Sequence, residues 1–186
     1  ELGLDSAHIA KGEWFIANQN NYFHEVSNGD HMELIDYENK TETRADLRFR
    51  RVTLRKPDYL GGSIVSGMLI DDLLHMDAPN LPFEREQGLF KDFAIRMSKL
   101  GIRPQTHRET FMQNMLKDPY LNALRLKYGY AITCHKAQGG EWPEVFMLFE
   151  PALFHPNNAQ WFHRWVYTAV TRASQKLHLR ENLIVQ

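Results

Sequence analysis

The order of segments near the end of the chain constrains the possible fold most. Residues 145–149 form a continuous apolar run, which is typical of a strand covered on both faces. Residues 159–173 place two tryptophans and two aliphatic side chains on one helical face, and residues 176–179 have a second short strand pattern. Strand, helix and strand in this order predict an α/β fold with a parallel sheet.

The first third of the chain has a different pattern, which predicts a small antiparallel β-rich region. Strand-forming residues occur at 13–17, 31–37 and 42–55. The Asn-Gly-Asp sequence at 28–30 is a strong turn signal, and a second turn is expected at 38–40. Residues 42–55 fit one or two strands, so the antiparallel β-rich region is expected to cover residues 13–55.

After a proline- and glycine-containing loop at 57–62, the apolar spacing changes to one that favours helices. Thr106 is the expected cap of the last helix, and Asp118-Pro119 is its expected end. The predicted helices cover residues 64–73, 89–100 and 106–116.

Composition excludes several classes of protein. Hydrophobic residues make up 43% of the chain, which indicates a folded domain, and the net charge of −1 restricts any nucleic-acid contact to a local surface. The single cysteine, Cys134, rules out an intramolecular disulfide and a zinc site of paired thiolates, and the nine histidines do not lie at metal-ligand spacing. No metal site is therefore predicted. Without a signal peptide or a bilayer-spanning run, a cytoplasmic location is expected.

Two segments contain the side chains best suited to bind phosphate groups. Residues 129–142 place hydroxyl, imidazole and amide groups beside a double glycine, after an expected strand end at 130–133. Ligands of open α/β sheets bind at the carboxyl ends of strands, where backbone N–H groups and glycines allow close approach. Residues 165–173 place Arg172 near a helix end, and a guanidinium matches phosphate geometry with two donors.

These two segments resemble motifs V and VI of superfamily 1 helicases of the RecD-like and UvrD-like group. The first motif is present as Thr133-Cys-His135-Lys136-Ala-Gln138-Gly139-Gly-Glu141-Trp142, and the second as Tyr167-Thr168-Ala169-Val-Thr171-Arg172-Ala173. A weaker resemblance at 14–30 is to the RecD-like segment that opens the same domain. The motifs are in the family's order, although Ala137 and Gly140 stand where serine is common.

The resemblance implies a fold and a division of the chain. The fold is a RecA-like α/β domain, of the kind found in P-loop NTPases, with an inserted β-rich and helical subdomain. Residues 1–27 would begin the RecA-like domain, residues 28–127 would form the insertion (β-rich over 28–56 and mainly helical over 57–127), and residues 128–186 would complete the domain.

The resemblance also implies a role for each matched residue. Arg172 would be the catalytic arginine finger, which reaches the γ-phosphate of ATP from the second of two RecA-like domains. Nucleotide-binding roles would fall to Gln138, Gly139 and Glu141. DNA-binding roles would fall to Thr133 and His135.

The chain lacks the other half of an ATPase site. It contains no GxxxxGK[ST] loop, and Asp71-Asp72 is interpreted as a helix turn rather than as a magnesium-binding acidic pair. ATP and Mg²⁺ would therefore be held mainly by an N-terminal RecA-like domain of the same protein, and the initial Glu1 suggests a fragment of a longer chain. The fragment alone is not expected to hydrolyse ATP. Further implied partners are single-stranded DNA and the nuclease or helicase subunits of an exodeoxyribonuclease V type of assembly, in repair or recombination.

Alternative interpretations remain for the chain and for its residues. In the alternative interpretation, the chain is a non-catalytic module that binds nucleic acid or protein, and it has kept the helicase fold without the catalytic function. Arg172 would then be a helix end, Thr133 a cap of the following turn, and His135 a structural histidine. An independent enzyme is not supported, since the sequence has no nucleophile elbow, metal cluster or paired carboxylates.

Overall fold

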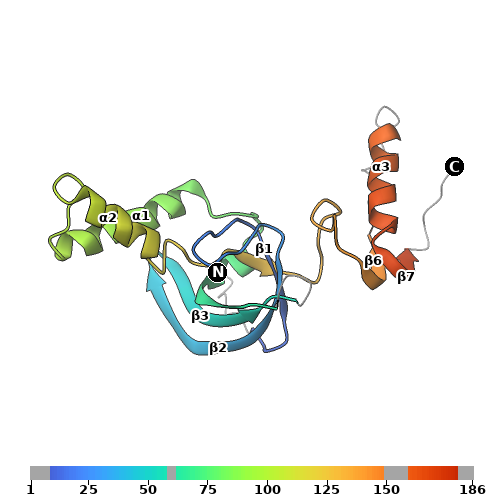
Figure 1. Ribbon diagram of the computed structural model, residues 1–186, viewed down its shortest axis with the longest axis horizontal. Coiled ribbons are helices and arrows are strands. Elements are labelled where there is room, and N and C mark those ends of the chain that lie inside the picture. Colours follow the sequence, from blue (N-terminus) through green and yellow to red (C-terminus); the bar gives the residue numbers. More distant parts are fainter. Residues whose placement is uncertain (1–8, 58–61, 149–158, 180–186) are drawn as a thin grey trace, which may run out of the picture. The chain divides into compact units, whose positions relative to one another are not determined.

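A computed structural model describes residues 9–57, 62–148 and 159–179 of the chain (Figure 1). It divides into two compact units, residues 1–130 and residues 131–186. Residues 58–61 of the predicted loop and Phe149 of the predicted strand lie outside the described residues.

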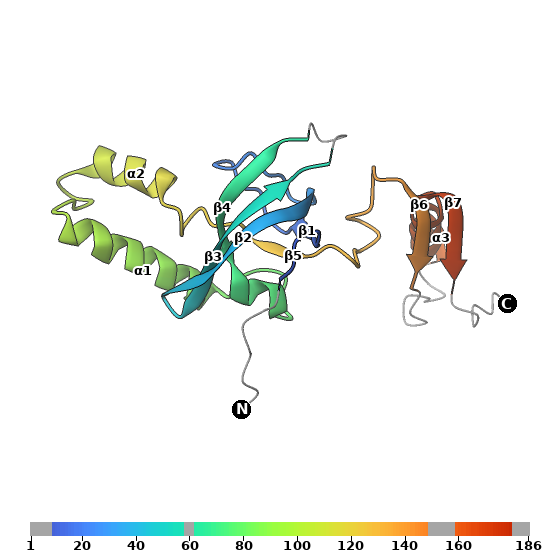
Figure 2. The same ribbon diagram turned by 90° about the horizontal axis from the view of Figure 1, so that it is seen from below.

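The first unit is built on a five-stranded antiparallel sheet, which Figures 1 and 2 show as a strongly curved layer. The strand order is β4-β3-β2-β1-β5, and each neighbouring pair is antiparallel. Alternate residues of the strands are buried, because one face of the sheet covers the core. The strands are β1 (Trp14–Ala17), β2 (His31–Arg44), β3 (Leu47–Arg55), β4 (Ile64–Ile70) and β5 (Leu126–Tyr128).

The hairpin between β2 and β3 differs from the expected one. The turn predicted at 38–40 is wrong, because β2 continues through these residues and accommodates them as a register shift between Tyr37 and Thr41. The chain reverses instead at Ala45 and Asp46, which have φ values of 47° and 58°. Two-residue hairpin turns require positive φ, and neither residue is the glycine or asparagine that would have indicated it. The turn at 28–30 is confirmed, with φ 96° at Gly29.

The helix predicted over 64–73 is also wrong. Residues 64–70 form β4, which pairs with β3 from Arg55↔Ile64 to Phe49↔Ile70. A 3-10 helix, η2 (Asp71–His75), follows. The apolar spacing favoured a helix because Met68, Leu69 and Ile70 are all buried. This strand therefore lacks the alternation of apolar and polar residues that identifies a half-exposed strand in a sequence. The expectation that 57–127 is mainly helical therefore fails over its first part.

The two later helices are confirmed with shifted limits. They are α1 (Phe83–Lys99) and α2 (Arg108–Lys117). They pack through Phe93 and Phe111, whose ring centroids lie 5.1 Å apart. Gly101 follows the end of α1 with φ 76°, and α2 ends before Asp118 as predicted. The predicted cap is wrong, since His107 precedes α2 and no side chain caps it.

An ion pair is buried where η2 meets the sheet. Asp71 is fully buried and Arg50 is 5% exposed. The Arg50 guanidinium donates to both carboxylate oxygens, at 3.1 Å from Nε to Oδ1 and 2.8 Å from Nη2 to Oδ2. The neighbouring Asp72 accepts hydrogen bonds from the backbone and side chain of Arg48. The acidic pair thus stabilises a helix turn, in agreement with its interpretation from sequence.

The second unit contains the predicted strand, helix and strand. Strand β6 (Trp142–Met147), helix α3 (Ala159–Val170) and strand β7 (Ala173–Leu179) follow in order, and the two strands are parallel. However, β6 is not covered on both faces, since Phe146 is 75% exposed and stacks on His178 at 4.2 Å between centroids. The strand end expected at 130–133 is wrong, because β5 ends at Tyr128.

The described chain is therefore a mixed α/β protein with an antiparallel sheet and a parallel strand pair. A larger RecA-like parallel sheet is not part of what the structure describes, and it stays a prediction. The division into a domain start at 1–27, an insertion at 28–127 and a domain end at 128–186 stays a prediction as well.

One histidine of the first unit should make stability depend on pH. Burial lowers the pKa of His24 below its ordinary value of 6.5, and a hydrogen bond with the Asn122 backbone opposes this only in part. Below pH 6.5 the unfolded chain therefore binds a proton that the folded chain resists, so the free energy of unfolding should fall as the pH drops through 6.5. Between about pH 7.5 and about pH 5.5, chemical denaturation should show a larger decrease in the free energy of unfolding for wild type than for His24→Gln. Equal losses would contradict the assignment.

Candidate functional site

The turn at residues 134–139 is held by hydrogen bonds that begin at Thr133. The Thr133 hydroxyl oxygen accepts the N–H of Lys136 at 3.4 Å, and its carbonyl accepts the N–H of Ala137 at 3.1 Å. The N–H of Gln138 donates to the carbonyl of His135 at 3.3 Å. Thr133 therefore makes the contact that its structural interpretation as a turn cap requires, while its side chain remains exposed.

The two glycines at the end of the turn, Gly139 and Gly140, are each required for a different reason. Gly139 has φ 83°, a conformation that favours glycine. Gly140 leaves room for an indole ring, since a Cβ there would lie 2.3 Å from Cη2 of Trp142. The departure from serine at this position is explained by the Trp142 ring, which occupies the space that a side chain would need.

Arg172 joins the two predicted motifs. Its Nη1 donates to the carbonyl of Gly140 at 2.7 Å, so the end of the first motif lies against the arginine of the second. Its Nε donates to the carbonyl of Thr168 at 2.9 Å, and its Nη2 to the hydroxyl of Thr171 at 3.0 Å. These acceptors are all neutral, and Arg172 forms no ion pair with a carboxylate in the described part of the chain. The guanidinium is therefore oriented, but its charge is not neutralised.

The turn is also tied to α3 and β6 through the backbone. The N–H of Trp142 donates to the carbonyl of Arg172 at 2.9 Å, and the Cys134 thiol lies 3.5 Å from the carbonyl of Trp165. Burial raises the pKa of Cys134, although the charge of Arg172 opposes the shift. Burial lowers the pKa of Lys136. The Cys134 thiol is thus a packing group here and not an activated nucleophile.

The remaining predicted residues are exposed and lie in this turn or close to it in sequence. Gln138 and Gly139 are part of the turn, and Glu141 directly precedes β6. His135 is exposed on the same turn. In the described part of the chain, Arg172 contacts the first motif through the Gly140 carbonyl and the Trp142 N–H, and the nucleotide and DNA roles of the exposed residues stay predictions. The sequence analysis gave no role to Thr168 and Thr171, which accept hydrogen bonds from the Arg172 side chain. The signal that could have indicated them is their position, four residues and one residue before an arginine near a helix end.

The contact between Gly140 and Trp142 leads to a prediction about stability. Gly140→Ser should destabilise the fold by about 1–3 kcal/mol, because the new side chain forces the indole ring to move. Trp142→Phe in the same chain should recover part of that loss, since the smaller ring leaves the space free. A double-mutant cycle of urea denaturation measures both effects. Additive losses would contradict the steric explanation.

Neither a metal centre nor a membrane segment is found in the residues that the structure describes. They contain no group of three or more His, Cys, Asp or Glu side chains placed to hold a metal ion. None of the described helices combines the length and the apolar character that crossing a bilayer requires.

Comparison with known proteins identifies one segment of the chain. Residues 128–180 match the family model of the UvrD-like helicase C-terminal domain, which covers less than a third of the chain. The match includes both predicted motifs and the elements β6, α3 and β7. No curated protein matches the chain. The segment that holds Arg172 is therefore similar to the C-terminal domain of superfamily 1 helicases.

Proposed function

We propose that this chain is the C-terminal motor domain of an ATP-dependent DNA helicase or translocase, in which Arg172 is the arginine finger. The observation that supports this best is the state of the Arg172 side chain. Three hydrogen bonds to neutral oxygens orient the guanidinium, and no carboxylate among the described residues neutralises it. An oriented, uncompensated guanidinium binds a phosphate group without the energetic cost of breaking an ion pair.

The same position beside the glycine turn supports the nucleotide-binding roles. Gln138, Gly139 and Glu141 are proposed to line the cleft that ATP occupies when an N-terminal RecA-like domain closes on this one. That domain would supply the phosphate-binding loop and the Mg²⁺ site, which this sequence lacks. Its closure would bring the γ-phosphate to Arg172, where the developing charge is stabilised during hydrolysis.

Thr133 and His135 are proposed to contact the backbone of single-stranded DNA. Both side chains are exposed on the turn whose far end contacts Arg172 through Gly140. One short segment would then couple strand contact to nucleotide contact, as a translocating motor requires. Contacts to the phosphates would make strand binding weaker as the salt concentration rises.

The RecD-like subtype is a further part of this proposal. It is supported by the segment at 14–30, where β1 leads into the Asn-Gly-Asp turn. A protein of this kind would act in recombination or repair, with nuclease or helicase subunits of the exodeoxyribonuclease V type as partners. This assignment depends on resemblance, because fold alone does not determine function.

The test is the ATPase activity of the full-length protein, measured with and without single-stranded DNA, for wild type and Arg172→Ala. A large fall in the stimulated rate, with strand binding retained, would support the motor function. An unchanged rate would favour the alternative of a non-catalytic module, in which Arg172 only caps the C-terminal end of α3 through the Thr168 carbonyl.

A further inference from the structure

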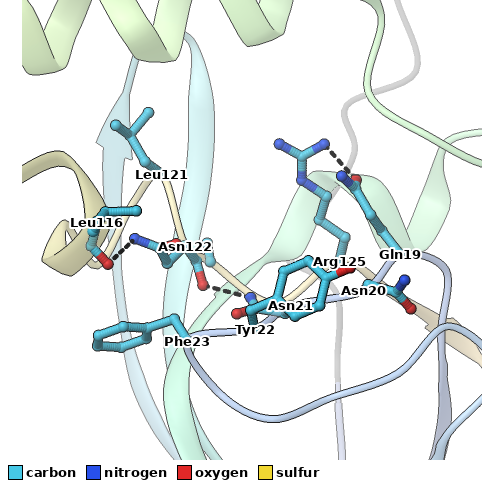
Figure 3. A pocket seen from close by; sticks show the side chains of 10 residues that line it. Gln19, Asn20, Asn21, Tyr22, Phe23, Leu116, Leu121, Asn122 and Arg125 are labelled. Atoms are coloured by element: carbon cyan, nitrogen blue, oxygen red, sulfur yellow. Dashed lines mark hydrogen bonds between the residues drawn. The ribbon is translucent and has the colours of Figure 1, made fainter. Parts of the chain in front are cut away.

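A pocket in the first unit lies between the loop at 18–26 and the segment that leads from α2 to β5 (Figure 3). Its volume is about 440 Å³. Figure 3 shows Phe23 with Leu116 and Asn122 at one end and Gln19 and Asn20 with Arg125 at the other, with Tyr22 between them. The lining contains no carboxylate, although acidic residues account for 23 of the 186 positions in the chain.

Two adjacent aromatic side chains of this pocket are exposed to solvent. Tyr22 is 89% exposed and Phe23 is 49% exposed. The ring of Phe23 is supported from behind by the imidazole of His24, at 4.8 Å between centroids and nearly perpendicular. The imidazole in turn packs so closely on Gly67 that a Cβ there would lie 2.6 Å from it. Among the described contacts this backing belongs to Phe23, whereas the nearly fully exposed Tyr22 ring offers an open face for stacking against a planar ligand.

The loop that presents these rings is held at several points. Asn21 and Val26 exchange two backbone hydrogen bonds, at 2.7 and 3.0 Å. The side chain of Asn21 accepts the N–H of His24 at 3.2 Å and donates to the carbonyl of Asn122 at 2.8 Å. A ligand would therefore meet an ordered loop and would lose little affinity to the entropic cost of ordering it.

The polar groups at the other end of the pocket offer donors. The side-chain oxygen of Asn20 accepts the N–H of Asn28 at 2.7 Å, and that of Gln19 accepts from Arg125 at 2.7 Å. Each amide is thereby fixed through its oxygen, and neither NH₂ group has an acceptor in the part of the chain that the structure describes. These donors match the carbonyl and ring-nitrogen acceptors that nucleobases present.

The charge of the pocket favours a base over a phosphate. Arg125 is its cationic group, and it is already paired with Glu86. A phosphate would have to compete with that carboxylate, whereas a neutral ring would not. Stacking rings, fixed amide donors and a neutralised guanidinium together match an unstacked nucleobase of a single strand.

We infer that this pocket binds one unpaired nucleobase of a single-stranded nucleic acid, stacked on Tyr22 and hydrogen-bonded by the amides of Gln19 and Asn20. The inference rests on the proposed function in one respect, namely that the protein meets single strands. It adds a base-contacting site in the first unit, separate from the phosphate contacts proposed for Thr133 and His135.

The test is equilibrium binding of a fluorescein-labelled oligothymidylate to the full-length protein, without ATP. Tyr22→Ala should weaken binding about 5- to 150-fold, which corresponds to about 1–3 kcal/mol for one stacked base. Tyr22→Phe should bind nearly as wild type, since the ring remains. Phe83→Ala removes a ring of similar exposure at the start of α1, outside the pocket, and should have no effect.

Two further measurements separate a base contact from a structural effect. An abasic strand of equal length should bind wild type and Tyr22→Ala equally, because it has no base to stack. The dependence of affinity on salt should keep its slope in Tyr22→Ala, because no phosphate contact is lost. An unchanged affinity for oligothymidylate, or an equal loss on the abasic strand, would overturn the inference.

Measuring binding without ATP also keeps this test separate from that of the motor. If Arg172→Ala abolishes hydrolysis while Tyr22→Ala binds oligothymidylate as wild type does, the base site alone is rejected and the motor function stands. If wild type binds no single strand, both the base site and the proposed strand contacts are rejected.

Discussion

Arg172→Ala is expected to lower the single-strand-stimulated ATPase rate of the full-length protein about 10³- to 10⁵-fold, the range known for arginine fingers. The reason is electrostatic. The guanidinium would stabilise charge that develops on the γ-phosphate, and alanine offers no donor in its place. Steady-state hydrolysis at saturating ATP and DNA measures the effect, and single-strand affinity without ATP shows whether the fold and the strand contact survive.

Two variants provide controls for this result. Arg172→Lys keeps the positive charge but loses the planar fork that contacts Gly140, Thr168 and Thr171 at once, so it should restore little of the rate. Arg164→Ala removes a positive charge from an exposed position on α3, the helix that precedes Arg172, and should change the rate by no more than a few-fold. A wild-type rate in Arg172→Ala would reject the finger and leave the helix cap as the role of this residue.

Asp71→Ala is expected to have the largest effect on stability, a loss of about 3–5 kcal/mol in the free energy of unfolding. Asp71 is fully buried, and its carboxylate accepts two hydrogen bonds from Arg50. Without it the guanidinium remains buried and loses both hydrogen bonds to the carboxylate, which is the costly state. Chemical denaturation of the variant and wild type measures the difference.

Matched substitutions in the same sheet test this explanation. Glu38→Gln removes the partner of Arg51 in a largely exposed ion pair, and should change stability by less than about 1 kcal/mol. Replacing both members of the buried pair, as in Arg50→Met with Asp71→Leu, should recover much of the loss because no buried charge remains. If Asp71→Ala lowers the free energy of unfolding no more than Glu38→Gln does, the buried ion pair is not important for stability.

The sequence alone was sufficient for the elements whose signals are local. The turn at 28–30 needs a residue that tolerates positive φ, and Gly29 supplies it. The two later helices have an apolar face at helical spacing, and the order of strand, helix and strand predicts the parallel pair β6 and β7. The segment similar to helicase C-terminal domains was also identified from its residues, because a motif depends on residue types at fixed spacing.

Pairing between distant residues was decided only by the tertiary structure. Residues 64–70 have apolar spacing compatible with a helix, and their pairing with β3 makes them a strand. The turn at Ala45 and Asp46 lacks the glycine or asparagine that marks most turns of this kind, and the register of β2 on β3 imposes it. In the same way, the pocket beside Tyr22 unites residues from 19–23 and 116–125, which are far apart in sequence.

For the candidate site, too, the sequence indicated some features and only the tertiary structure decided the others. Its residue types were evident from the motifs, since a guanidinium, a double glycine and a threonine-capped turn are chemical features of the chain itself. The sequence did not reveal that the Gly140 carbonyl, Thr168 of α3 and the following Thr171 orient Arg172, or that the Trp142 ring excludes a side chain at position 140. Those contacts depend on distances between segments, which residue types and local spacing do not specify and which only packing of the folded chain determines.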